Sequence, residues 1–480
     1  MFYANVAKWC GAQNIHVGDI VPRFNQPNLI DTLFAIKRGA RVRNMIPPPP
    51  PEMNPILDEE MILGEEDVDE IIDMGDIEKV DSSSEDESGT FSGHDILEND
   101  LPRDDAMRVY CPYKPEEDIK HSIFSCSLSK NGELAVIGDE NDRAYVFNII
   151  TGEIIIDCGL DHKDSVIFTE FNYNDKYVAT ADMSGVIQLW QISNKSCIWS
   201  TNLYDDITWV KWHHSANVLL VSVASGEIHI LKIGNIEAHK IIPRGYGNGD
   251  VPFAGVILAD GKRAALGYRN GTICVIDLKV NKVLSTTPGD PTGLHGHSDT
   301  IIALDCHTDD NLLISISQGG KTMLSTAHNG KIISILQDLN SNKTEISEAG
   351  DSDSERRFSL EAAAFCKDPT FPVAATGIID YEDSDKGRIY IWDVSRQVLR
   401  HEIKQEAGVT RLVWTNTSIF FTGGLDGILR CFDAKAGCHL RSFLGHTNTI
   451  LDLHISCEGK KVVTSSDDGT ARIFDISSLY

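Results

Sequence analysis

The chain of 480 residues has an apolar share of 41% and a formal net charge of −28 at pH 7. No apolar run approaches the roughly 20 residues needed to cross a bilayer, and the N-terminus lacks the apolar core of a signal peptide, so we expect neither a transmembrane segment nor secretion. The 11 cysteines are scattered without a CxxC pair, which is typical of reduced thiols inside a cell. We expect a cytoplasmic protein, with a nuclear pool or peripheral membrane association left open.

The negative charge is concentrated toward the N-terminus. Residues 1–52 carry six basic and three acidic side chains, whereas residues 53–118 carry four basic and 23 acidic ones. An acidic field attracts basic partners and repels phosphate backbones, so the composition favours protein partners with basic segments and argues against direct nucleic-acid binding. Solubility alone is the competing explanation of the charge.

The first 104 residues are predicted to be disordered, because they lack hydrophobic periodicity and contain acidic blocks that cannot bury a core. We divide them into a basic, proline-rich extension at 1–52 and an acidic tail at 53–104. The charge changes sign near residue 53, and we hypothesise that residues 1–52 are an alternative or mispredicted extension. Ser83 and Ser84 precede acidic residues, as acid-directed kinases prefer, and are candidate phosphosites.

Residues 105–480 are predicted to fold as one repeat body. Short β-rich runs punctuated by Gly, Asp and Asn recur about every 40 residues, which is the spacing of propeller blades. One unit cannot cover its own apolar faces, so neighbouring units are expected to stack. Eight units align through their third strands, which are RAYVFN, VIQLWQ, EIHILK, TICVID, KTMLST, RIYIWD, ILRCFD and ARIFD.

Two further segments complete this body. The eighth unit ends directly after its third strand, so the run MRVYC at 107–111 is predicted to supply the missing outer strand and close the ring. Between the fifth and sixth units, residues 338–357 are polar, acidic and aperiodic, and we expect a disordered surface loop. Ser352 and Ser354 in this loop are two more candidate phosphosites.

Residues at repeat-specific positions resemble the WD-repeat family. The Gly-His pair of that family matches His297 and His446, and His162 stands at the same place after an Asp. The resemblance implies an all-β WD40-type propeller of eight blades, with a buried hydrogen-bond network. This network is structural, because a buried His needs partners for both ring nitrogens. The residues assigned to it are His162, His297, His446, Asp426, Asp468, Trp190, Trp392 and Asp393. In the last unit, Ser465 or Ser466 is expected to supply the hydroxyl.

No catalytic pattern is present. The chain has no phosphate-binding glycine loop, HExxH or GxSxG motif. The glycine-rich run at 244–250 joins two predicted strands, and the adjacent His213 and His214 are better explained by a surface turn than by zinc. We expect a monomeric, non-enzymatic protein without cofactor or metal. Because carboxylates are abundant, an unrecognised enzyme site is the weaker alternative.

The aligned units place polar residues at one shared position, seven residues before the end of each inner strand. Asp164, Asp205 and Asp299 occupy it, with Asn448 in the last unit and Asp250 offset by one residue. In the WD-repeat family this position lies on the face around the central channel, so we expect an acidic rim suited to Lys or Arg side chains. The alternative is that each Asp only caps its own turn.

Three aromatic residues, Tyr204, Trp209 and Trp212, lie beside Asp205 in the sequence. Trp209 and Trp212 differ by three positions, so they point to opposite faces of a strand and at most one faces the rim. Core packing is the expected role of both.

Longer runs narrow the resemblance. VATADMSGVIQLWQI, DGKRAALGYRNGTICVIDLK and GLDGILRCFDAKAG are similar to the angio-associated migratory cell protein group over about residues 55–480. The resemblance implies a signalling scaffold linked to cell migration, the Rho pathway and, in vertebrates, angiogenesis. The group is also similar to a fungal WD-repeat chaperone of one basic large-subunit ribosomal protein, which implies the alternative role in ribosome biogenesis.

Overall fold

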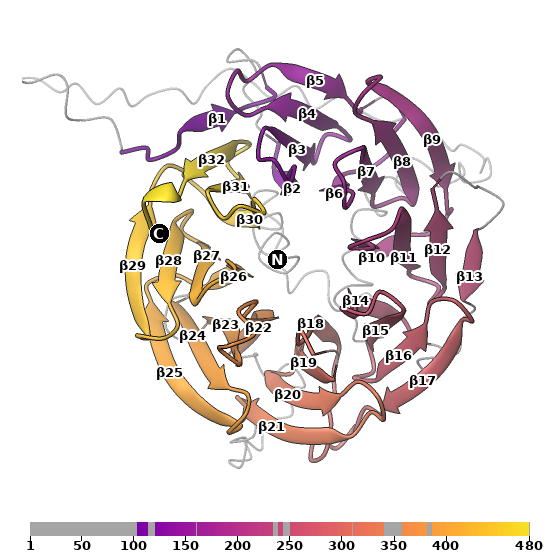
Figure 1. The fold of residues 1–480 in the computed structure, drawn as a ribbon, viewed down its shortest axis with the longest axis vertical. Coiled ribbons are helices and arrows are strands. Elements are labelled where there is room, and N and C mark those ends of the chain that lie inside the picture. Colours follow the sequence, from indigo (N-terminus) through magenta and orange to yellow (C-terminus); the bar gives the residue numbers. More distant parts are fainter. Residues whose placement is uncertain are drawn as a thin grey trace, which may run out of the picture. The chain divides into compact units, whose positions relative to one another are not determined.

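The computed structural model describes residues 103–113, 121–159, 161–233, 239–242, 250–309, 311–339, 358–381 and 386–479 (Figure 1). The predictions for residues 1–52, for nearly all of the acidic tail, for the loop after Leu339 and for the four candidate phosphosites lie outside these residues.

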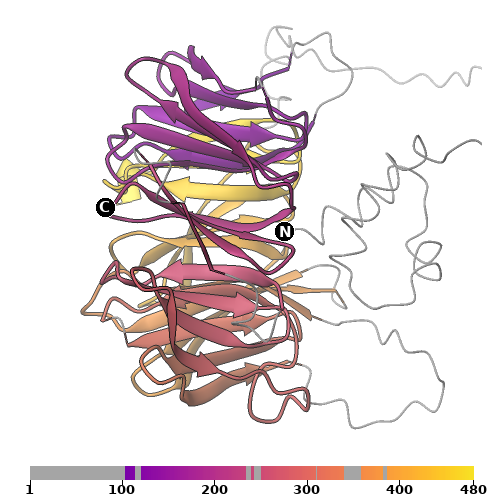
Figure 2. The ribbon, with the colours of Figure 1, turned by 90° about the vertical axis from the view of Figure 1, so that its right-hand side faces the viewer.

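The β-rich runs each form one strand, and successive strands pair antiparallel because short turns join them. Eight four-stranded sheets result, and Figure 1 shows them as blades around a common axis with one edge strand of each sheet, its inner strand, nearest that axis. In the side view of Figure 2 the strands cross the thickness of the ring, so the turns gather on two opposite faces. The eight-bladed all-β propeller is therefore confirmed.

The inner strands of blades 1 to 8 are β2 (Ile123–Leu128), β6 (Val166–Phe171), β10 (Ile207–Trp212), β14 (Pro252–Ile257), β18 (Ile301–Cys306), β22 (Phe358–Phe365), β26 (Val409–Trp414) and β30 (Ile450–Ile455). The second strands are β3 (Leu134–Asp139), β7 (Tyr177–Asp182), β11 (Val218–Val223), β15 (Arg263–Tyr268), β19 (Leu312–Ser317), β23 (Val373–Asp380), β27 (Ile419–Gly424) and β31 (Lys461–Ser466). The third strands are β4 (Ala144–Asn148), β8 (Val186–Gln191), β12 (Ile228–Lys232), β16 (Ile273–Asp277), β20 (Lys321–Thr326), β24 (Lys386–Asp393), β28 (Leu429–Asp433) and β32 (Ala471–Asp475). The outer strands are β5 (Ile154–Asp157), β9 (Ser196–Asn202), β13 (Lys240–Ile242), β17 (Lys282–Thr287), β21 (Ile332–Asp338), β25 (Val398–Gln405), β29 (Cys438–Phe443) and, in blade 8, β1 (Arg108–Tyr110). A short 3-10 helix, η4 (Ser477–Leu479), follows β32.

The ring is closed by the N-terminal strand, as the sequence predicts. β1 pairs antiparallel with β32, with Arg108 opposite Ile473 and Tyr110 opposite Ala471. The ring of Tyr110 stacks on that of Phe147 in blade 1, with centroids 4.1 Å apart. The strand therefore joins the last blade to the first, so that the blade 8 sheet does not end at an open third strand.

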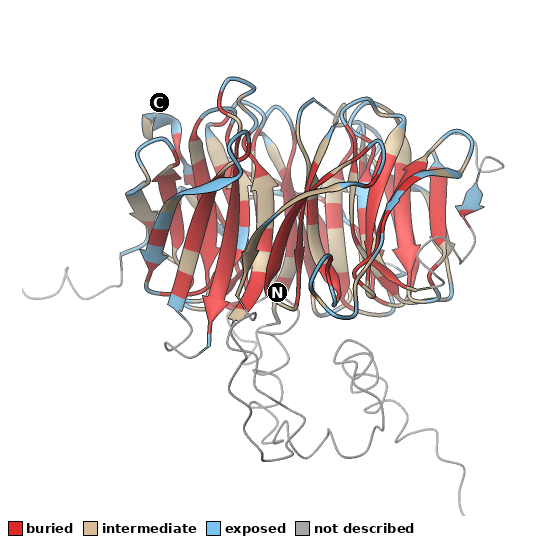
Figure 3. Ribbon diagram, turned by 90° about the horizontal axis from the view of Figure 1, so that it is seen from below, coloured by how far each residue is buried: buried red, intermediate tan, exposed pale blue. Residues whose placement is uncertain are grey.

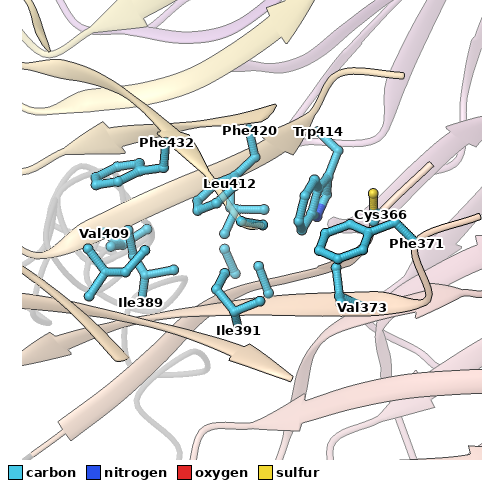
Figure 4. Packing of buried hydrophobic residues seen from close by; sticks show 14 residues of the cluster. Cys366, Phe371, Val373, Ile389, Ile391, Val409, Leu412, Trp414, Phe420 and Phe432 are labelled. Atoms are coloured by element: carbon cyan, nitrogen blue, oxygen red, sulfur yellow. The ribbon is translucent and has the colours of Figure 1, made fainter. Parts of the chain in front are cut away.

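The core lies between neighbouring blades. Figure 3 shows that the second and third strands are largely buried, whereas the turns and outer strands include most of the exposed residues. In the cluster between blades 6 and 7, Ile391 of β24 faces Trp414 of β26 and Phe420 of β27 (Figure 4). Each large side chain buried in this way stabilises the fold by roughly 1.5–3 kcal/mol, which is why a blade depends on its neighbours.

The start of the predicted loop at 338–357 needs one correction. Asp338 is the last residue of β21, where it pairs with Lys321 in the ladder and its carboxylate lies 3.2 Å from the Lys321 ammonium. The ion pair holds this residue in the strand, so the loop begins later than predicted. Among the described residues, no helix combines the length and apolar character that a membrane crossing requires.

Candidate functional site

The five rim residues occupy one structural position. Each lies two residues before an inner strand and is partly exposed, and its side-chain oxygen accepts the N–H of the next residue over 2.7–2.9 Å. The residues are Asp164, Asp205, Asp250, Asp299 and Asn448. They therefore share one face of the ring, the face on which the chain enters the inner strands, which we call the entry face.

The offset expected for Asp250 is wrong. Because β14 ends at Ile257, Asp250 precedes the strand end by the same seven residues as its counterparts. The sequence comparison had misjudged where this inner strand ends. Every inner strand has a register shift, which follows the first pair in seven blades and the third pair, Leu360 with Ile378, in blade 6. The residue two positions before the last pair ahead of the shift is His121, Phe358 and Ala407 in the other three blades.

The carboxylates therefore form an arc and not a full rim. Asp164, Asp205, Asp250 and Asp299 belong to blades 2 to 5, which are consecutive in the ring. We call these four residues the acidic arc. The remaining four blades place His, Phe, Ala and Asn at the same position, so at this position the carboxylates occupy one half of the ring only.

Backbone contacts fix the direction of these side chains. Asp205 accepts the N–H of Asp206 at one oxygen (2.9 Å) and the N–H of Ser225 at the other (2.8 Å). Asp250 also pairs with Arg269 over 2.9 Å, which offsets part of its charge. The turn-capping explanation is thus correct for the individual residues. It leaves a binding role open, because an ionised carboxylate has about four acceptor sites.

Both ring nitrogens of the network histidine have a carboxylate or hydroxyl partner in blades 2 and 8. His446 contacts Asp468 through Nδ1 (3.0 Å) and Thr464 through Nε2 (2.8 Å). The hydroxyl was expected from Ser465 or Ser466, but the strand alternation turns Ser465 away and Ser466 bonds the Asn448 carbonyl. Thr464 therefore supplies it.

In blade 2 the carboxylate comes from an unexpected place. His162 contacts Asp182 through Nδ1 (3.2 Å) and Thr180 through Nε2 (2.8 Å). Asp182 is the last residue of β7, whereas Asp468 lies in the turn after β31. The sequence comparison, which looked for Asp in the turn, missed Asp182.

The other residues assigned to this network make different contacts. His297 reaches only Ser315 (2.7 Å), and its Nδ1 has no partner among the described residues. Trp392 donates to Thr376 (3.1 Å). For three further residues the assignment is wrong, because local partners take their polar atoms. Trp190 donates to Gln188, Asp426 pairs with Arg430, and Asp393 accepts the N–H of Arg396.

Deeper along the axis, charged side chains of the inner strands meet. Lys211 pairs with Glu170 over 2.8 Å, and Arg411 pairs with Asp452 over 3.1 Å. The Glu170 carboxylate raises the pKa of Lys211. Sequence reasoning missed these pairs, although a charge inside an otherwise apolar strand is a readable signal.

These axial groups also complete the sheet edges. An inner strand is the edge of its sheet, so its outward N–H groups need partners from elsewhere. Asp452 accepts the N–H of Cys126 in the next blade (3.2 Å), and Asp305 accepts that of Phe365 (2.8 Å). The charged side chains near the axis therefore have a structural role, which is to bind one another and the free N–H groups of neighbouring inner strands.

The three aromatic residues near Asp205 take different roles. Trp212 is buried and donates to the Glu170 carbonyl, and half-buried Trp209 packs against the Cα of Gly255. Tyr204 is 88% exposed. In the described part of the chain, no group of three or more His, Cys, Asp or Glu side chains is arranged to hold a metal ion.

The fold and its buried His networks define a WD-repeat propeller, and the repeat family described as WD domain, G-beta repeat, matches residues 437–475. The chain belongs to the angio-associated migratory cell protein family. It is 34% identical to the dog protein of that name and 33% identical to the human one, over 74% of this chain and 77% of each relative.

The fold is also that of solved fungal propellers. Sqt1 of Chaetomium thermophilum, in a crystal structure bound to the N-terminus of the ribosomal protein L10, matches with a TM-score of 0.64 at 16% identity, covering 78% of this chain and 100% of that one. The ribosome assembly protein SQT1 of Saccharomyces cerevisiae is 21% identical over 65% of this chain and 74% of its own length.

Proposed function

We propose that this protein is a non-catalytic holder of a basic protein segment, which it binds in the cytoplasm on the acidic arc. The observation that carries the proposal is the placement of four carboxylates on consecutive blades of one face, each already oriented by a backbone N–H. Oriented carboxylates pair well with Lys and Arg side chains, because little freedom is lost on binding.

A basic ribosomal protein is the client that we favour. The Sqt1 propeller with the same fold was crystallised with the N-terminus of L10. A basic segment of this kind is held apart from nucleic acids and other polyanions while it is covered by carboxylates. The protein would then act as a chaperone before the ribosomal protein is assembled.

A signalling scaffold is the second candidate. Identity of 33–34% to the mammalian angio-associated migratory cell proteins favours a partner in cell migration and Rho-pathway signalling. The two candidates differ in the identity of the partner, so native co-purification followed by identification of the bound proteins separates them.

The binding surface is tested by charge reversal. We expect the triple variant Asp164→Lys, Asp205→Lys and Asp299→Lys to lose binding of the L10 N-terminus in a fluorescence titration. Binding to the native chain should weaken steeply as ionic strength rises, because the Debye length shrinks to about 8 Å at physiological salt.

A matched control carries the same change in net charge on the opposite face. Glu133, Asp368 and Glu458 lie in the turns that follow inner strands, so their reversal to Lys leaves the entry face intact. If the control loses binding as the arc variant does, the interaction follows net charge only and the proposed surface is wrong.

A further inference from the structure

The most exposed large apolar side chain in the described part of the chain is Tyr204, at 88%. It lies in the loop between β9 and β10, directly before Asp205 of the acidic arc. It belongs to none of the buried clusters among the described residues, whereas its neighbour Leu203 packs on the cluster between blades 2 and 3. The fold gains little burial from this ring, so the ring is open to contact with a partner.

The loop holds Tyr204 in a defined conformation. Its backbone adopts a φ of 56°, in the left-handed region that a bulky residue seldom adopts. Its N–H donates to the Asn202 side chain over 2.6 Å. The turn of blade 2 lies against the loop so closely that a Cβ on Gly185 would come within 2.5 Å of the Asp205 carbonyl oxygen. The backbone that carries the ring is thereby fixed relative to the carboxylate that follows it.

The ring and the carboxylate suit one kind of ligand group. Asp205 is oriented by two N–H donors and is partly exposed. A cation can lie over a tyrosine face while it pairs with a nearby carboxylate. A guanidinium does both at once, because it is planar, stacks on aromatic rings and donates in its own plane, whereas an ammonium is a compact and strongly hydrated point charge.

No cation of the described chain already occupies this ring. Phe371, by contrast, has the guanidinium of Arg400 at 5.0 Å and the ammonium of Lys435 at 5.3 Å from its centroid. Among the described residues, Tyr204 has no such contact. Within the described residues, the Tyr204 ring therefore has no structural role as a support for a Lys or Arg side chain of the protein itself.

We propose that Tyr204 and Asp205 form a subsite that selects an arginine side chain of the bound basic segment. The inference rests on the proposed function, and it adds a preference that the charge of the arc cannot supply. At long range the charge of the arc attracts Lys and Arg alike, and at contact its carboxylates offer Arg only the advantage of bidentate pairing. The aromatic ring adds a further preference for the planar guanidinium.

Two synthetic peptides test this subsite. They have the same length and net charge, and carry either arginine or lysine as their only basic residues. We expect the native chain to bind the arginine peptide about two- to fivefold more tightly, the range that an exposed cation–π contact supplies. Tyr204→Phe keeps the ring and should keep the full preference, whereas Tyr204→Ala and Tyr204→Leu should lose the part of it that the ring supplies.

A second exposed tyrosine serves as the matched control. Tyr381 follows β23 in blade 6, in a turn equivalent to the one that carries Ser225, and is 42% exposed. It is on the entry face but outside the acidic arc, three blades from Tyr204, so Tyr381→Ala should leave the arginine preference unchanged. Thermal unfolding of each variant verifies that the propeller is intact.

The outcomes separate the two proposals. If Tyr204→Ala retains the full arginine preference, the subsite is refuted while the holding function stands. If the native chain binds neither peptide, the proposed function itself fails. Loss of preference in Tyr381→Ala as well would assign the discrimination to aromatic surface in general and would also overturn the subsite.

Discussion

Each buried His network of blades 2 and 8 is held together by hydrogen bonds to both nitrogens of one imidazole ring. In blade 8 the Nδ1 of His446 faces the carboxylate of Asp468 and therefore carries the proton, which leaves Nε2 as the acceptor for Thr464. Burial alone would raise the pKa of Asp468, but hydrogen bonds from His446, Thr470 and the Thr447 N–H hold that pKa well below its usual value. The network is satisfied only when all of these partners are present.

We therefore expect Thr464→Val to destabilise the protein by about 1–3 kcal/mol, since it leaves a buried ring nitrogen without its donor. Urea unfolding measures the change. Thr447→Val is the control, because Thr447 is exposed and only its backbone N–H enters the network. Equal loss in both variants would show that the hydroxyl of Thr464 contributes nothing specific.

The buried His297 of blade 5 leads to a prediction about how the stability of the protein depends on pH. Burial, with a smaller contribution from Lys321, lowers the pKa of His297 to about 3. The neutral form is thus favoured in the fold, so this residue's contribution to stability is complete above its unfolded pKa of about 6.5 and is lost as pH falls toward 3. His297→Gln removes the titration. Between these pH values we expect the native chain to lose about 1.4 kcal/mol per pH unit relative to the variant.

Denaturant unfolding of both chains at several pH values measures that difference. A constant difference across the window would mean that His297 titrates normally and that its burial is not maintained in solution. Because other groups titrate identically in both chains, they cancel in this comparison.

At the scale of elements, β1 decides whether the ring closes. Besides its ladder with β32, it is held by Asp105, which exchanges two hydrogen bonds with Leu444, and by the ion pair of Asp104 with Arg472. Tyr110 is 7% exposed and stacks on Phe147. This short segment therefore adds to the direct contact between the first and last blades, in which β2 packs against β30 and β31.

Tyr110→Ala should cost about 3 kcal/mol, as truncation of a buried aromatic side chain does. Tyr110→Phe should stay within about 0.5 kcal/mol, since the hydroxyl has no partner among the described residues. Deleting residues 105–115 should lower the melting temperature more than either substitution. If the deletion leaves it unchanged, another segment closes the ring.

The blades and their closure could be predicted from the sequence because both follow from local pattern. Turn residues mark the strands, and a missing outer strand demands a donor. The sequence did not predict the contacts that depend on which face of a strand a residue occupies, or on how neighbouring blades pack. Thr464 replaced Ser465 or Ser466 because one residue of alternation reverses the face. Glu170 and Lys211 belong to neighbouring blades, and only the packing of one blade on the next brings them together.

At the scale of the whole molecule, charge is divided evenly between two parts of the chain. Residues 1–102 carry seven basic and 21 acidic side chains, a net −14, which is half of the total of −28. The acidic arc belongs to the other half. Both parts attract a basic segment at long range, but only the arc presents carboxylates oriented by the fold.

Removing residues 1–102 should therefore slow the association of an arginine-rich peptide more than it weakens the final complex. Charge at a distance steers encounter, and we expect the full chain to associate about threefold faster or more at low ionic strength. Stopped-flow fluorescence measures the rate, and the advantage should vanish as salt screens charges beyond about 10 Å. Faster association of the truncated chain would instead mean that the acidic segment competes with the peptide for the rest of the molecule.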